Sequence, residues 1–444
     1  MNAAGATITI FLAFVVLVGS RTWAALGIMA GVCYVTQGQQ IYVQVFHFTA
    51  IRLILLAGIV RCLIRGELKA IKYSSIDGAM IGFMASGLII YMARERTSEA
   101  FVFFLGIIYD TMLAYYVIRS LITSGEDALK FFHRLAFVVF PFAVLMLQES
   151  LTHYNAFRFM GGQGWDEGVF REGRIRCVAS FRGPHSAGIF GATMAPFFFA
   201  LWFASRKRLA GTLGLVAAVV ITFTSNSSGP LTAFVMGVVG ISFWRFRHHM
   251  QTIRRVIVVA LISCHLMMKA PVWFLFSRMS DILGGDGWNR SMVIDRTVHH
   301  FSEWWLLGAK DTLRWMWNNP DLTGEMDLTD QFVGTAVSGG LLTLIFYILI
   351  FVRSFGQLGR AIHRVKEHST ETTWLLWSLG AALFAHLMAL FSVGYFDQIS
   401  VWWWGFVAII ASVSTDALKS APVPYNADAP DGEFPSDAIC EPVG

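Results

Sequence analysis

Repeated apolar runs constrain this chain more than any other feature of its sequence. A helix of about 20 apolar residues crosses the ~30 Å hydrocarbon core of a bilayer, and the 444 residues carry thirteen runs of roughly that length. Hydrophobic residues make up 55% of the chain and charged residues 14%, which is too little polar surface to cover a soluble globule. We therefore expect an all-α polytopic membrane protein with about 12–13 transmembrane helices. The predicted spans are about 5–20, 22–37, 46–64, 76–93, 99–121, 134–150, 186–204, 209–225, 230–244, 256–276, 332–352, 373–393 and 399–415.

Basic residues in the short connections predict the orientation of these spans. If the spans alternate, five basic clusters fall on one side, which the positive-inside rule makes cytoplasmic. Arg94 and Arg96 are the one exception. The five clusters are Arg61, Arg65, Lys69 and Lys72; Lys130 and Arg134; Arg206, Lys207 and Arg208; Arg245, Arg247, Arg254 and Arg255; and Arg353, Arg360, Arg364 and Lys366.

Two long polar segments, at about 151–185 and 277–331, interrupt the apolar runs, and the predicted orientation places both on the outer face. We divide the chain into N-terminal transmembrane helices (1–130), a core that carries the two polar segments (131–415) and a tail (416–444). The tail is rich in Pro, Asp and Glu and lacks an apolar period, so we expect it to be disordered and cytoplasmic. The first apolar run lacks the basic n-region of a signal peptide and should remain a span.

The first polar segment predicts an anion site. Arg171, Arg174, Arg176 and Arg182, followed by His185, precede the small-residue run SAGIFGA, which should begin a helix at the outer surface. The free N–H groups of a helix start favour anions, and one arginine can bind two oxygens of a phosphate at once. The alternative is that these arginines neutralise nearby carboxylates, or that His185 only caps the helix.

The second polar segment predicts an amphipathic helix between about residues 289 and 305 that lies on the membrane surface. Such a helix would hold Arg290 or Arg296 over an entrance between spans. A solvated face with ordinary i,i+3 and i,i+4 pairs is equally compatible with this pattern. Asp327 and Asp330 stand before the next span, where one carboxylate is expected to cap the helix and the other to be available as a base.

Several classes of protein are excluded by missing motifs. The chain has no P-loop, no HExxH and no GxSxG, which argues against an ATP-driven pump, a zinc protease and an α/β-hydrolase. Its five cysteines have no metal-binding or disulfide spacing. We expect no cofactor, no metal and no nucleic-acid partner.

Four stretches carry a family resemblance: RCVASFRGPHSAG, TSNSSGPLTAF, WNRSMVIDRT followed by LLGAKD, and DLTDQFVGTAVSGGLLTLIFYILIF. Their order and topology resemble the O-antigen ligase and O-antigen polymerase superfamily of bacterial inner-membrane proteins across roughly residues 130–410. The resemblance implies a GT-C-like fold with a large periplasmic loop. It also implies metal-independent transfer of a glycan from undecaprenyl diphosphate to a glycan or lipid acceptor, with a chain-length regulator as a possible partner.

The resemblance assigns roles to particular residues. It matches Arg176 and Arg290 to family arginines, and Asp330 falls where the family usually shows a His-Asn or Thr-Asn pair. Together with the residue pattern, this makes Arg176 and Arg182 with Arg290 or Arg296 the expected ligands of the diphosphate, and Asp330, then Asp327 or His185, the expected base. Two departures from the family stand out. Its usual Ser-Arg-Gly reads Ser227, Ser228, Gly229 here, and no histidine occupies position 329 or 330, where lipid A core ligases usually carry one. These departures favour a surface polysaccharide (O-antigen or exopolysaccharide) polymerase over an O-antigen ligase, and they leave a non-catalytic member possible.

Charged residues inside the spans suggest a competing function. Arg52, Asp110, His265 and His386 fall deep in predicted spans, where a secondary transporter or flippase would use them as a relay. A buried pairing of Arg52 with Asp110 is the interpretation that we favour. The run Trp402–Trp404 is expected to form an interfacial belt.

Overall fold

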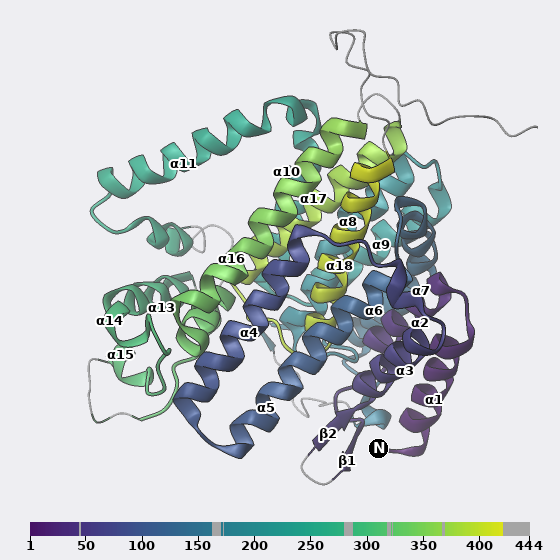
Figure 1. Ribbon diagram of the computed structural model, residues 1–444, viewed down its shortest axis with the longest axis horizontal. Coiled ribbons are helices and arrows are strands. Elements are labelled where there is room, and N and C mark those ends of the chain that lie inside the picture. The colour runs from purple at the N-terminus through teal and green to yellow at the C-terminus, as the bar shows by residue number, and fades with distance from the viewer. Residues whose placement is uncertain are drawn as a thin grey trace, which may run out of the picture.

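The computed structural model describes residues 1–43, 46–161, 170–171, 173–278, 287–317, 321, 323–365 and 369–420, and helices dominate it (Figure 1). The α-helices are α1 (Ala3–Val18), α2 (Arg21–Tyr34), α3 (Ala50–Ile64), α4 (Ser75–Glu95), α5 (Ser98–Ile108), α6 (Ala114–Leu121), α7 (Gly125–Thr152), α8 (Pro184–Phe203), α9 (Arg208–Thr224), α10 (Ser228–Ser242), α11 (Met250–Met267), α13 (Gly287–His299), α14 (Phe301–Trp304), α15 (Leu313–Trp317), α16 (Gln331–Val365), α17 (Thr370–Leu390) and α18 (Asp397–Ser420). A π-helical turn, η2 (Tyr109–Leu113), joins α5 to α6.

The few other elements are short. The 3-10 helices are η1 (Glu67–Ala70), η3 (Arg158–Met160), η4 (Phe243–His249) and η5 (Val272–Phe274). Strands β1 (Gln40–Val43) and β2 (Phe46–Thr49) form one antiparallel pair, and β3 (Phe170–Arg171) and β4 (Arg174–Ile175) form another. The predicted span at 46–64 is therefore helical only from Ala50, because its first four residues form β2.

Each predicted span overlaps a helix, although the span at 256–276 extends beyond Met267, where α11 ends. Within the described residues, nine helices are long and apolar enough to cross a membrane, and α1 and α9 are shorter apolar helices. The chain is therefore a helical, multi-pass membrane protein, while the count of twelve or thirteen spans stays a prediction. The predicted tail begins too early, because α18 continues to Ser420. Residues 421–444 lie outside the described residues.

Helices α8, α17 and α18 form the centre of the bundle, because 83%, 78% and 89% of their apolar windows are buried. Small residues let α8 and α9 approach closely, as helix packing in membranes requires. Gly191 lies against Ile221, and Gly214 lies against the ring of Phe198. The predicted aromatic belt is wrong, since Trp402, Trp403 and Trp404 are 1%, 1% and 6% exposed within this core.

The bundle has two chemically different ends (Figure 1). The connections at residues 96–97, 225–227 and 391–396, together with the described residues of 153–183 and 268–330, lie at one end, which we call the loop end. The N-terminus lies there too. The opposite end, where α18 finishes at Ser420, is called the tail end, and the described residues of the five basic clusters lie in or beside its connections. The described residues of both long polar segments thus share one end, while the membrane face of that end stays a prediction.

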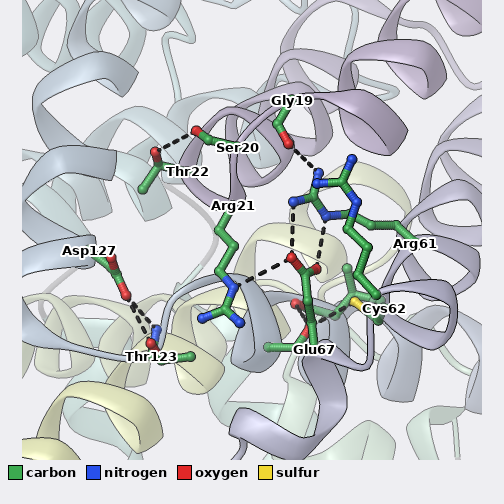
Figure 2. A network of polar contacts seen from close by, with 12 residues as sticks. Gly19, Ser20, Arg21, Thr22, Arg61, Cys62, Glu67, Thr123 and Asp127 are labelled. Carbon is green, nitrogen blue, oxygen red and sulfur yellow. Dashed lines mark hydrogen bonds and ion pairs between the residues drawn. The ribbon is translucent and has the colours of Figure 1, made fainter.

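A buried charge network fixes part of the tail end (Figure 2). The Arg61 guanidinium donates to both carboxylate oxygens of Glu67 at 2.9 and 3.0 Å. It also donates to the carbonyls of Val16 and Gly19, at 2.7 and 2.6 Å, where α1 ends. Burial alone would raise the pKa of Glu67, but the hydrogen bonds and charges of Arg61 and Arg21 outweigh burial and lower this pKa. Arg61 therefore holds helices together, in addition to its expected role in orientation.

At the loop end, the segment α13–α15 packs as a small helical unit against the first turns of α16. Val293, Trp304 and Trp315 form an apolar cluster with Val333 and Val337 of α16. Helix α11 instead stands apart from the bundle, and none of its residues is buried (Figure 1). A hydrophobic sequence alone does not distinguish these two situations, because lipid and protein are both apolar surroundings.

The exceptional pair Arg94 and Arg96 lies at the loop end, and Arg94 has a structural role there. Its guanidinium donates to the carbonyls of Ala309 and Val337 at 3.3 and 3.2 Å, and to Glu95 at 2.9 Å. Arg94 therefore connects α4 to the helical unit and to α16. Such a structural contact accounts for the departure of Arg94 from the distribution of the five basic clusters.

Candidate functional site

The segment between Arg176 and Arg182 is fixed to the bundle along its length. The buried Glu149 of α7 accepts hydrogen bonds from the backbone N–H groups of Val178 and Ala179 at 3.2 and 2.8 Å. The Ser180 hydroxyl donates to the carbonyl of Cys33 at 2.7 Å. Gln398 donates to the carbonyl of Ser180 at 2.7 Å. Because the middle of the segment is held so tightly, the two arginines at its ends are held in place as well.

Arg176 forms a compact polar group with His185 and Ser227, which we call the Arg176 cluster. The Arg176 Nη2 atom donates to the Ser227 hydroxyl at 2.6 Å and lies 2.9 Å from His185 Nε2. Since a guanidinium only donates, His185 Nε2 accepts and the ring is neutral in this arrangement. The histidine is thereby engaged as an acceptor, which makes it a poor candidate for a base while the bond persists.

Two helix starts point into the same region. Helix α8 begins beside His185 with Gly183 as its N-cap, and α10 begins directly after Ser227. Gly183 has no side chain that could cap α8, and the Ser227 side chain makes no capping hydrogen bond to α10. Uncapped N–H groups carry partial positive charge and bind anions. Together with Arg176 they form a positively polarised region at the loop end.

Arg182 lies in a different setting. Its guanidinium is 3.6 Å from the Asp397 carboxylate at the start of α18, and it lies over the ring of Phe396. Arg52 and Asp110 form a bidentate pair at 2.7 and 2.6 Å, which confirms their predicted pairing. Asp397 also interacts electrostatically with Arg52 and Asp110. These four residues, the paired cluster, balance one another's charge, so Arg182 attracts an anion less strongly than its sequence context suggests.

Asp330 combines the two roles that the sequence divided between Asp327 and Asp330. Its Oδ1 accepts from the N–H groups of Phe332 and Val333 at 2.7 and 3.1 Å, which caps α16. Its Oδ2 is buried and has no hydrogen-bond partner among the described residues. Burial raises the pKa of Asp330 to about 7, although the backbone bonds and the charge of Arg290 act to lower it. Asp327 is exposed.

The predicted surface helix exists as α13 and carries both Arg290 and Arg296. Val293 and Thr297 of this helix are buried, whereas Val298 is 47% exposed. Val293 packs in the helical unit against α16, so this helix is docked on the protein. Both arginines are half-buried. Residues 279–286, which precede this helix, lie outside the described residues.

The connection between α17 and α18 links these groups. Gly229, two residues after Ser227, lies against Ser392 and Val393. The Tyr395 N–H donates to Gln331, next to Asp330, at 2.7 Å. The connection ends at Asp397, the partner of Arg182. The Arg176 cluster, the paired cluster and Asp330 therefore border one short stretch of chain, although they come from distant parts of the sequence.

Backbone strain marks the same region. Ala179, Asn226 and Asp397 have φ angles of 50°, 43° and 55°, a left-handed conformation that costs non-glycine residues about 1–3 kcal/mol. Each lies in or next to one of the groups described above. Such strain persists only where surrounding contacts enforce it, and it is common at functional sites. The π-helical turn that carries Asp110 is a second irregularity of this kind.

Sequence reasoning missed some of these partners. The sequence pattern assigns no role to Glu149, Asp397, Gln331 or Gln398. A buried glutamate near the end of a span was the available signal for Glu149, since such a group needs a partner. Ser227, one of the partners of Arg176, is 51 residues away from it, and no local pattern indicates this contact.

No protein-family profile matches this chain, and no curated protein matches it. The resemblance to the O-antigen ligase and polymerase superfamily therefore supports a proposal of function. Within the described residues, no group of three or more His, Cys, Asp or Glu side chains lies close enough to hold a metal ion. The arrangement offers cationic and dipolar binding groups beside a carboxyl group with a pKa near neutrality.

Proposed function

We propose that this chain is a bacterial inner-membrane glycosyltransferase that moves a glycan from undecaprenyl diphosphate to an acceptor hydroxyl on the periplasmic face. A surface polysaccharide polymerase is the favoured form, and an O-antigen ligase is the alternative within this class. The observation that carries the proposal is Asp330, a buried carboxyl whose pKa is raised to about 7 and whose Oδ2 lacks a hydrogen-bond partner among the described residues. A base with such a pKa is suited to work near neutral pH.

The proposed reaction needs two kinds of group. The acceptor hydroxyl loses its proton to Asp330 Oδ2 as its oxygen bonds to the anomeric carbon. The bond from that carbon to the diphosphate breaks, and undecaprenyl diphosphate leaves with the electron pair. Arg176 and the starts of α8 and α10 stabilise the charge that develops on the diphosphate. Arg290 lies close enough to Asp330 to affect its pKa, so we assign it to the same diphosphate.

The remaining candidates receive less support. Arg182 is balanced by Asp397, and His185 is engaged by Arg176. Arg296 shares α13 with Arg290, and its Nε is buried without a hydrogen-bond partner among the described residues. Arg296 therefore stays a candidate ligand of the diphosphate.

The experiment is replacement of Arg176 by Ala in a bacterial strain that depends on this chain, with polymer length read on a gel and membrane levels measured. We expect loss of long polymer at normal membrane level. Asp330→Asn should lower the rate by about 10²–10⁴-fold, because the amide keeps the helix cap and cannot take a proton. Arg96→Asn is the matched control, since Arg96 is exposed at the same end and asparagine tolerates its positive φ.

Two outcomes contradict the proposal. Full-length polymer in both the Arg176→Ala and Asp330→Asn strains would remove the assigned chemistry. Loss of export on exchanging Arg52 or Asp110, with no effect of the Arg176 and Asp330 changes, would instead indicate a transporter or flippase. In that comparison, the charge-reversed pair Arg52→Asp with Asp110→Arg controls for simple loss of the ion pair.

A further inference from the structure

A small cavity, whose enclosed volume of about 10 Å³ has room for one water-sized atom, lies at the tail end, remote from the candidate site. It is formed between the end of α6, the last turns of α18 and the connection that precedes α4. Its polar lining residues are Lys72, Arg119, Thr123, Ser412 and Thr415. The Lys72 side chain is 48% exposed, so the cavity opens to the surface beside this ammonium group.

Two polar atoms of the lining lack a partner. Arg119 Nε and Thr415 Oγ1 are buried and make no hydrogen bond within the part of the chain that the structure describes. Arg119 is 2% exposed and Thr415 is 5% exposed. An unsatisfied buried polar group costs about 1–3 kcal/mol, and a charged one costs more. Two such groups around one cavity indicate that a ligand atom belongs between them.

The chemistry of the lining selects the ligand. The Ser412 hydroxyl donates to the carbonyl of Arg119 at 3.5 Å, and the Thr123 hydroxyl donates to Asp127 at 2.9 Å. The groups that are left are the Arg119 Nε–H, the Thr415 hydroxyl and the Lys72 ammonium. A guanidinium and an ammonium only donate, and a hydroxyl donates readily. Three donors that line one cavity fit an anionic oxygen and disfavour a cation.

The carboxylates nearby are already occupied. Asp77 accepts from Arg119 at 3.0 Å, from the Tyr115 hydroxyl at 2.6 Å and from the Ser74 N–H at 2.7 Å. Asp416 lies 3.3 Å from the Lys72 ammonium, which keeps two further hydrogens for another acceptor. These contacts hold the Arg119 guanidinium and the Lys72 ammonium in place without filling the cavity.

We propose that this cavity binds one oxygen of a phosphate group, between Arg119 and Thr415, while the other oxygens of that phosphate stay at the mouth beside Lys72. The cavity lies where α6 ends at Leu121, α4 begins at Ser75 and α18 nears its end at Ser420, which is the depth at which lipid phosphates meet a spanning bundle. A phospholipid head group and free phosphate share this chemistry, and the site does not depend on the proposed enzymatic function.

The test is thermal unfolding of the purified full chain under two conditions. In detergent, inorganic phosphate is compared with sodium chloride at equal ionic strength. In phosphate-free nanodiscs, phosphatidylglycerol is compared with an uncharged glycolipid that has no phosphate. We expect the unfolding temperature to rise with phosphate, with phosphatidylglycerol or with both. The condition in which it rises shows whether the site takes free phosphate or a lipid head group.

Variants make the test specific to the cavity. Lys72→Met and Thr415→Val should each weaken the binding of phosphate about tenfold, so that about tenfold more phosphate is needed for the same rise in unfolding temperature. This is the effect expected for the loss of one charge-assisted or buried hydrogen bond. Lys419→Met, an exposed lysine at the end of the same helix as Thr415, should leave it unchanged. The proposal is overturned if phosphate and phospholipid raise the unfolding temperature no more than chloride and glycolipid do, which would mean that the cavity holds an ordered water only. It is also overturned if phosphate raises the unfolding temperature of all three variants equally.

Discussion

Asp330 shows how much of the site depends on a single side chain. One carboxylate oxygen is fully used in capping α16, while the other is buried without a partner among the described residues. The sequence predicted both a cap and a base from the pair Asp327 and Asp330, because carboxylates are favoured at helix starts. It could not predict that one residue supplies both, since this depends on the burial of Asp330 beneath contacts made by distant residues.

The raised pKa of Asp330 predicts a pH-dependent stability. The folded state favours the protonated carboxyl, so its contribution is complete below the ordinary pKa of 3.8 and is lost as the pH rises through about 7. Asp330→Asn is neutral at every pH and should not show this loss. We therefore expect the difference in unfolding temperature between variant and parent to grow from pH 4 to about pH 8. Parallel curves for the two proteins would show that the pKa of Asp330 is not raised.

At the scale of elements, most helices follow directly from the sequence, because an apolar run in a membrane satisfies its backbone groups only as a helix. What the sequence could not tell is which apolar face meets protein. The Trp402–Trp404 run lies in the core, while α11, equally apolar, has no buried residue. The break in α16 at Gly340 is another feature that depends on tertiary contact, since the Leu341 N–H donates to the carbonyl of Trp305 at 2.8 Å.

Replacement of Gly340 by Ala should disrupt this junction. Gly340 has φ 66° and ψ −178°, a region open essentially to glycine alone. An added Cβ would lie 2.7 Å from the carbonyl oxygen of Leu306. We expect a loss of about 2–4 kcal/mol in the free energy of unfolding, measured as a lower unfolding temperature in detergent.

Gly359 provides the matched control within the same helix. An added Cβ at Gly359 meets nothing within 4 Å, and alanine favours a helix over glycine by about 0.5–1 kcal/mol. Gly359→Ala should therefore preserve or slightly raise the unfolding temperature. Equal behaviour of the two variants would mean that the docking of the helical unit on α16 does not require Gly340.

At the scale of the whole molecule, the two ends of the bundle have different charge chemistry. The tail end has basic side chains bound to carboxylates or helix carbonyls, as in the Arg61 and Arg119 networks. The loop end adds helix starts and a carboxyl of raised pKa to its arginines. The alternation of spans predicted this separation from the sequence alone. The convergence of residues near 176, 227, 330 and 397 could not be predicted, because it requires the packing order of the helices.

The most direct test of the central claim, that Arg176 and the helix starts beside it hold a diphosphate, is the binding of undecaprenyl diphosphate to the purified protein in nanodiscs. We predict saturable binding that Arg176→Ala weakens by at least about tenfold, as for a lost charge-assisted contact, and that Arg96→Asn leaves unchanged. Equal binding by the parent, Arg176→Ala and Arg96→Asn proteins would contradict the account.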